Sequence, residues 1–227
     1  MSFLRSSFSR LIRSACVLML SAPLHLALAT DTKATSENAA LVAAEPNYRN
    51  RDESWYWGFS LGAGSVRYKD AGFQSVIDGL KSNSAISHMT VGYDLHFLWP
   101  LSNHRTAIGL VLGGAVDNYT ADATDEQFSV TSLVTGFSIQ HYLTSNIGEG
   151  PFVRGDIGLA TTQLEIRKPS LTSSSDISRG LGLRLAAGYS FLLSNETRLP
   201  VTVHWLHVNS SGNTTNSSGL LTVGVLF

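Results

Sequence analysis

Five polar side chains share a sequence pattern that places them on one face of neighbouring extended segments. They are Gln140, Arg154, Asp156, Arg184 and His204. Each stands at a parity otherwise filled mainly by small or polar residues, and residues two apart in a strand point to the same side. Folding the segments about their turns predicts Asp156 opposite Arg184 and Arg184 near His204. Across another turn, Arg154 should face Gln140. Clustered charges are tolerated inside a protein when they are paired and hydrogen-bonded, so we expect a buried polar network.

The segment His204-Trp205-Leu206-His207-Val208-Asn209-Ser210 carries a second group with possible chemistry. An imidazole can activate a hydroxyl as a nucleophile, and an acid usually orients that imidazole. His207 lies on the apolar parity, but the residue two positions later is Asn209, and Ser210 has the opposite parity. No Asp or Glu follows Glu196. We therefore predict no catalytic residue, and a polar cluster around His207 would be the sign of an enzyme.

Strands must position these residues, because large apolar residues alternate with small or polar ones along most of the chain after residue 54. In the first such segment Trp55, Trp57 and Phe59 alternate with Tyr56, Gly58 and Ser60. Similar segments occur at 55–64, 89–97, 108–113, 133–140, 152–160, 181–191, 201–205 and 221–227. Eight is the smallest even number of strands known for membrane barrels.

The connections between these segments are of two kinds. Compact ones lie at 100–104, 144–150 and 194–197, and mostly longer polar ones lie at 69–84, 120–126, 167–175 and 210–218. Short turns at the periplasmic end and longer outer loops are typical of outer-membrane barrels. The first long connection has Phe73, Val76, Ile77 and Leu80 at near-helical spacing. It is predicted either as a short amphipathic helix that caps the mouth or contacts lipopolysaccharide, or as a mobile loop.

The pattern predicts an all-β fold, an eight-stranded antiparallel up-and-down transmembrane β-barrel over residues 55–227. A closed barrel is the strand-built way to cross a bilayer, because every edge amide is then paired. A soluble ligand barrel is the alternative, and its outer face would be polar. Here Leu, Val and Trp dominate one parity, and charged residues are only 15% of the chain, against about 25% in ordinary domains. The formal net charge of -1 gives no nucleic-acid footprint.

The N-terminus has the features of a secretory signal peptide at 1–29. Arg5, Arg10 and Arg13 precede the apolar run at 15–20, and Ala27-Leu28-Ala29 fits a cleavage site. The alternative is a membrane anchor, but Pro23 interrupts the stretch. Cleavage would remove the only cysteine, at position 16, and with it any disulfide. Residues 30–54 are polar and patternless, and we interpret them as a flexible periplasmic lead-in.

From residue 55 onward the chain resembles the small bacterial outer-membrane β-barrel superfamily, which includes the OmpA membrane domain, OmpX, OmpW and PagL. The resemblance rests on the opening WYWGFSLGAG segment, the repeated alternation with small residues, and the closing segment from Leu221 to Phe227. It implies that Leu221, Val223, Val225 and Phe227 form the signal read by the outer-membrane assembly machinery. PagL-type lipid A deacylases place a Ser two residues after a His on the outer face, and Asn209 departs from that pattern.

These observations predict a monomeric outer-membrane protein, structural or surface-interacting, with a largely plugged lumen and outer loops as its partner-facing part. The polar network would hold the plug. Outer-membrane lipid and lipopolysaccharide are the expected partners, and no metal, cofactor or nucleic acid is expected. Two alternatives remain open. One is a narrow channel for small solutes, in which the network acts as a gate, and the other is a lipid A-modifying acyl hydrolase.

Overall fold

The computed structural model describes residues 54–144, 146–168, 171–194, 197–211 and 214–227. The predicted signal peptide at 1–29 lies outside the described residues, as does the predicted lead-in at 30–54 apart from its last residue.

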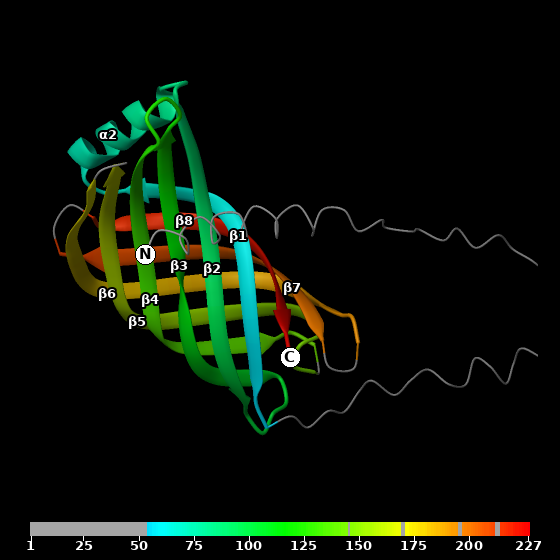
Figure 1. Ribbon diagram of the computed structural model, residues 1–227. Coiled ribbons are helices and arrows are strands. Elements are labelled where there is room, and N and C mark those ends of the chain that lie inside the picture. Colours follow the sequence, from blue (N-terminus) through cyan, green and yellow to red (C-terminus); the bar gives the residue numbers. More distant parts are fainter. Residues whose placement is uncertain (1–53, 145, 169–170, 195–196, 212–213) are drawn as a thin grey trace, which may run out of the picture. The chain divides into compact units, whose positions relative to one another are not determined.

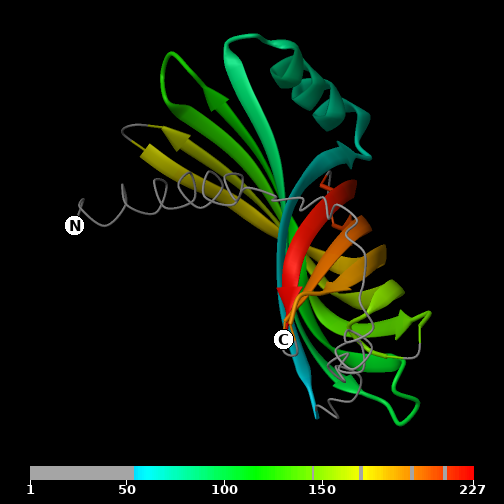
Figure 2. The same ribbon diagram turned by 90° about the vertical axis from the view of Figure 1, so that its right-hand side faces the viewer.

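Eight strands form one closed antiparallel barrel in which each strand pairs with its neighbours in sequence, and the first pairs with the last (Figures 1 and 2). The strands are β1 (Tyr56–Tyr68), β2 (Ile86–Pro100), β3 (Thr106–Ala121), β4 (Glu126–Tyr142), β5 (Gly150–Lys168), β6 (Leu171–Leu192), β7 (Arg198–Ser210) and β8 (Asn216–Leu226). The predicted up-and-down barrel fold is confirmed. Closure matters physically because it leaves no strand edge with unpaired amides.

Most strands extend beyond the predicted segments, chiefly at the end where the longer connections lie. β3 ends at Ala121 and β4 begins at Glu126, so the second long connection is a tight turn. The connection predicted at 167–175 is also shorter, because β5 runs to Lys168 and β6 begins at Leu171. Outside an apolar band, a strand no longer needs strict alternation, and its ladder hydrogen bonds can continue without that signal.

The first long connection forms a helix, α2 (Ala71–Ser82), so the helical alternative is the one observed. Asp70 caps its N-terminus, accepting a 2.7 Å hydrogen bond from the Phe73 amide, and Lys81 lies in its last turn. Both features stabilise a helix by satisfying free amides and complementing the helix dipole. Ile77 is fully buried, whereas Val76 is 60% exposed and does not belong to the docked face. Figure 1 shows α2 at the barrel end opposite the C-terminus.

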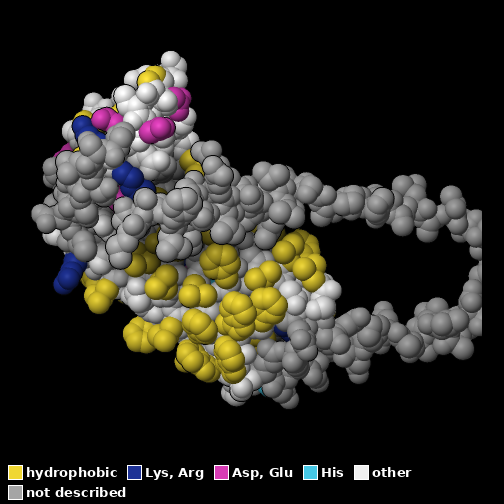
Figure 3. Space-filling view, in the orientation of Figure 1, with side chains coloured by type: hydrophobic (Ala, Val, Ile, Leu, Met, Phe, Trp, Pro, Cys, Tyr) yellow, Lys and Arg dark blue, Asp and Glu magenta, His cyan; other side chains and the backbone are white. Residues whose placement is uncertain are grey.

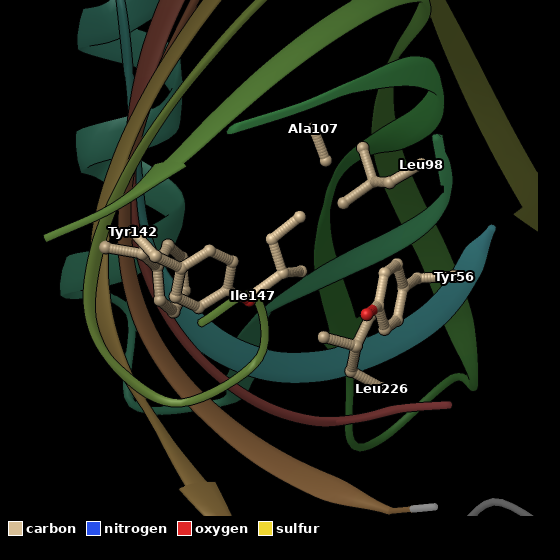
Figure 4. Packing of buried hydrophobic residues seen from close by; sticks show 7 residues of the cluster. Tyr56, Leu98, Ala107, Tyr142, Ile147 and Leu226 are labelled. Carbon is tan, nitrogen blue, oxygen red and sulfur yellow. The ribbon is translucent and has the colours of Figure 1, made fainter. Parts of the chain in front are cut away.

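Apolar side chains gather inside the barrel in separate clusters. Figure 4 shows the inner cluster, near the compact turns; it comprises Tyr56, Leu98, Ala107, Tyr142, Ile147, Phe152 and Leu226. An outer cluster lies under α2; it comprises Val66, Tyr68, Ile77, Ala115, Tyr119, Val130 and Leu220, with Phe73 and Leu80 packed against it. A smaller group contains Val134, Ala160, Leu206 and Val208. The strand residues among them occupy the inward parity of their strands, so their side chains project into the lumen.

Candidate functional site

A network of charged side chains, the lumen network, lies inside the barrel. Asp94 comes from β2, Arg154 and Asp156 from β5, and Arg184 from β6. Their side chains are 3% exposed or less. Gly113 on β3 makes room for them, since a Cβ there would lie 2.4 Å from the Arg184 Nη1 and 2.9 Å from the Asp94 Oδ1. A side chain at position 113 would therefore displace the ion pairs.

Arg154 joins both carboxylates. Its Nη1 and Nη2 donate to Asp94 Oδ2 and Oδ1 at 2.8 and 3.1 Å, a bidentate pair. Its Nε donates to Asp156 Oδ1 at 2.9 Å and to Ser138 Oγ at 3.0 Å. The planar fork of arginine suits such recognition of two oxygens at once. Arg154 thereby links β5 to β2 across the barrel interior, a contact that neighbouring strands do not make.

Arg184 completes a ring of two cations and two anions. Its Nε and Nη2 donate to Asp156 Oδ2 and Asp94 Oδ1, each at 2.5 Å. His96 Nδ1 lies 2.9 Å from Asp94 Oδ2. With a neutral His96 the ring has no net charge, and every carboxylate oxygen is hydrogen-bonded. Such an arrangement meets the requirement for keeping charges out of water.

The sequence pattern predicts some members of this network and does not predict others. Asp156 and Arg184 are direct partners in the β5–β6 register. Gln140 is opposite Arg154 in register, but its amide donates to the Tyr142 hydroxyl.

His204 does not join the network. It is opposite Ala186, and its Nε2 lies 2.8 Å from Thr222 Oγ1 on β8. Asp94 and His96 are the members that sequence reasoning missed, although both stand on the inward parity of β2. Their inward parity was the signal in the sequence that could have pointed to them. That β2 faces β5 across the lumen is seen in the closed barrel and not in the sequence.

A third buried carboxylate, Asp117 on β3, lies toward the outer mouth and is fully buried. Its Oδ1 accepts from Thr90 Oγ1 and lies 2.7 Å from His88 Nε2. Its Oδ2 accepts from the hydroxyls of Tyr119 at 2.7 Å and Tyr68 at 3.2 Å. The two tyrosines also belong to the outer cluster under α2. Asp117 thus fixes the groups against which the helix packs.

The outer wall of the barrel is apolar, with large side chains that face away from the lumen. Leu159 is 72% exposed and Phe137 is 71% exposed. Hydrophobic side chains cover much of the visible wall in Figure 3, and charged ones are seen toward the α2 end. At the other end, aromatic rings lie in pairs. Trp57 stacks on Phe227 with ring centroids 4.8 Å apart, and the ring of Tyr189 is tilted against that of Phe191 at 4.7 Å. Polar groups inside and apolar groups outside are the reverse of a soluble barrel.

The last strand seals the wall beside the first. Phe227 exchanges two backbone hydrogen bonds with Trp57, of 2.9 and 3.1 Å. Leu221 and Val223 are about half exposed on the outer face, and Val225 pairs with Phe59 of β1 in register. The four residues predicted as an assembly signal therefore lie along the β1–β8 seam.

A pocket of about 540 Å³, the rim pocket, opens on the outer face beside the N-terminal half of α2. Arg67 on β1 is opposite Ser217 on β8, and Ser217 is opposite His207 on β7. These three residues form one row across three strands. His207 Nδ1 lies 2.8 Å from Ser217 Oγ, and the His207 ring stacks on Trp205 at 5.8 Å. Lys69 lines the same pocket.

In a PagL-like enzyme a nucleophilic Ser would stand two residues after His207. Asn209 occupies that position here, and Ser210 does not replace the missing nucleophile. Ser210 is buried, and its hydroxyl lies 2.8 Å from Thr214 Oγ1. The hydroxyl beside His207 belongs instead to Ser217, which sequence order placed ten residues away. Within the part of the chain that the structure describes, His207 contacts no carboxylate. The polar cluster therefore exists, but no carboxylate among the described residues is hydrogen-bonded to His207 to orient the imidazole.

No protein-family model matches the chain, and no curated protein sequence is significantly similar to it. Among solved structures it is similar to Ail, the attachment invasion locus protein of Yersinia pestis, in complex with the heparin analogue sucrose octasulfate. The identity is 11% and the TM-score 0.49, with 77% of this chain and 100% of Ail covered. For Neisserial surface protein A the identity is 13% and the TM-score 0.45, with 77% of this chain and 96% of that protein covered. For the N-terminal barrel domain of Pseudomonas aeruginosa OprF the identity is 13% and the TM-score 0.39, with 77% of this chain and 98% of that domain covered.

At these identities the likeness concerns the fold alone. The class of protein is an eight-stranded antiparallel up-and-down β-barrel, as its own strand order establishes. This strand order is the architecture that the sequence pattern predicts. No helix among the described residues is long and apolar enough to span a membrane.

Proposed function

We propose that this protein is an outer-membrane barrel with a closed lumen, and that its role is structural or surface-interacting. The observation that carries the proposal is the inverted polarity of the barrel: four ionised side chains are buried inside while large apolar side chains such as Leu159 face outward. Water would oppose the exposed apolar wall, whereas a bilayer solvates it. The charges inside the barrel are tolerated because they are paired and hydrogen-bonded.

Closure of the lumen is supported by layers of side chains. The lumen network occupies one layer, the inner apolar cluster lies toward the compact turns, and the outer cluster and α2 lie toward the mouth. A cavity of about 10 Å³ adjoins the network, lined by Asp94, His96 and Arg154 among others. That volume is about the space of one water molecule. A conducting pore would need a continuous aqueous path instead.

The partners follow from this placement. The apolar wall would face lipid, and α2 with the outer strand ends would face the cell exterior, where exposed connections commonly bind partners. The seam residues Leu221, Val223, Val225 and Phe227 would be read by the assembly machinery before the barrel closes. The channel and acyl-hydrolase alternatives have weaker support. Charged and apolar side chains project into the lumen, and no described carboxylate is hydrogen-bonded to His207.

Current recordings in planar lipid bilayers test the closed lumen. Wild-type protein, shown to be folded by its heat-modifiable gel migration, should insert without producing steady ion conductance. This expectation rests on the ion pairs and apolar clusters that project into the lumen. Reproducible conductance steps from the same folded protein would contradict closure and would support the channel alternative.

A further inference from the structure

We infer that the rim pocket binds the phosphate group of a membrane lipid whose acyl chain lies along the adjacent barrel wall. This inference rests on the proposed placement of the barrel in an outer membrane. It adds a specific site and a chemical class of ligand to that placement.

The donors of the rim pocket are arranged for an anion. Arg67, Ser217 and His207 form one row on the outer face, and Lys69 lines the same pocket. Arg67 and Lys69 are both exposed, and neither side chain has a hydrogen bond or ion pair with any residue that the structure describes. Phosphate oxygens accept strong hydrogen bonds from such cations and from a serine hydroxyl. Two unpaired cations beside two polar side chains therefore fit a phosphate group.

One carboxylate also lines the rim pocket and limits the fit. Asp78 on α2 is exposed, and its Oδ1 accepts a 2.7 Å hydrogen bond from Gln74 Nε2. Gln74 is held in turn, because its Oε1 accepts from the Tyr68 amide at 2.7 Å. Asp78 thus has a partner on its own helix, whereas Arg67 and Lys69 have none. It would nevertheless repel an anion in the pocket, and this repulsion supplies a test of opposite sign.

The wall below the row leaves space for an acyl chain. Gly219 is opposite Ser65 on one side and Trp205 on the other, and a Cβ added to it would have no atom within 4 Å. The next row toward the membrane contains Ala63 and Leu221. Gly219 and Ser65 thus leave open space on the wall next to Trp205, between the rim pocket and the apolar wall. A ligand with both a phosphate and a hydrocarbon chain suits this combination better than a free anion does.

Calorimetric titration of the full-length folded protein in neutral maltoside micelles tests the site, with phosphatidic acid as one probe and inorganic phosphate as the other. Wild-type protein should bind phosphatidic acid more tightly than inorganic phosphate. The double variant Arg67→Gln/Lys69→Gln should weaken phosphatidic acid binding about tenfold, the combined effect of two exposed charge contacts. Removing repulsion by Asp78→Asn should tighten binding.

The chain offers a matched control for charge. Arg167 and Lys168 also lie at the outer end of the barrel, but they pair with Glu165 and Glu126. The variant Arg167→Gln/Lys168→Gln removes the same charges and should change the affinity less than about twofold. Gly219→Leu fills the open space at position 219, so it should weaken the binding of phosphatidic acid while leaving the binding of inorganic phosphate unaffected. Unboiled gel migration verifies that every variant is folded.

Three results would overturn the inference: equal losses in both double variants, weaker binding in Asp78→Asn, or equal wild-type affinity for the two probes with no effect of Gly219→Leu. The first would mean non-specific surface charge, the second a cationic ligand, and the third a site for free anions. A protein that folds in lipid vesicles but binds neither probe would refute the lipid site alone. A protein that does not fold in vesicles would refute the proposed function first.

Discussion

Each ion pair of the lumen network depends on the others. Asp94 accepts from Arg154 and Arg184, and Asp156 accepts from the same two arginines. Removing one carboxylate therefore leaves two guanidinium groups short of a partner, in a place that water reaches poorly. Neutralising one member of such a group lowers the stability of the folded state by more than the ion pair adds to it, because an uncompensated charge stays buried.

Asp94→Asn should lower the free energy of unfolding by about 3–5 kcal/mol, the usual result of breaking a buried ion pair. Urea unfolding in micelles, followed by tryptophan fluorescence, measures the change. Asp125→Asn is the matched control, since Asp125 is exposed at a turn with φ of 53°, a conformation that Asn also adopts readily. Similar losses in the two variants would show that the network does not stabilise the barrel.

At the scale of elements, α2 is held by its packing on the barrel. It has 12 residues, and isolated helices of that length are marginal in water. Ile77 supplies the fully buried contact, and Phe73 stacks edge-on against Tyr68 with ring centroids 4.8 Å apart. Because Tyr68 also donates to Asp117, the docked helix is connected to a buried group of β3. Loss of the apolar contact should release the helix while the strands remain paired.

Ile77→Ala should cost about 2–5 kcal/mol of docking free energy, as for other buried Ile truncations. Limited digestion with trypsin should then cut after Lys81 at least about tenfold faster than in wild type, since local opening governs cleavage. Val76→Ala, on the exposed side of the same turn, should leave the rate nearly unchanged. If both variants resist trypsin as wild type does, the helix is not held by Ile77.

At the scale of the whole molecule, the sequence pattern predicts the fold better than it predicts the site. Alternation identifies the strands and their facing sides, and loop lengths pair consecutive strands, so Asp156 opposite Arg184 follows from local geometry. The contact of Asp94 with Arg154 does not, because it spans the lumen and depends on how the closed barrel staggers its strands. Likewise, Ser217 reaches His207 from the next strand, which a search along one segment misses.

The outer ends of the strands were also beyond prediction from sequence. Phe128 on β4 is opposite Tyr119 with ring centroids 6.0 Å apart, and it packs against the outer cluster, beyond the segment whose alternation predicts this strand. Such residues pack under α2 rather than against lipid, so packing against the helix and not contact with the membrane determines which residue type stands there. Where a strand leaves the apolar band, its length is set by tertiary contacts that a pattern of period two does not encode.

We propose that this barrel requires a membrane to fold, because its polarity is inverted. Diluting the urea-unfolded protein into lipid vesicles and, in parallel, into lipid-free buffer tests it, with the folded fraction read from unboiled gel migration. We predict a heat-modifiable folded band with vesicles and none in buffer, because an apolar wall that includes Leu159 and Phe137 must be covered by lipid. A folded, monomeric and soluble species formed in buffer alone would contradict the account.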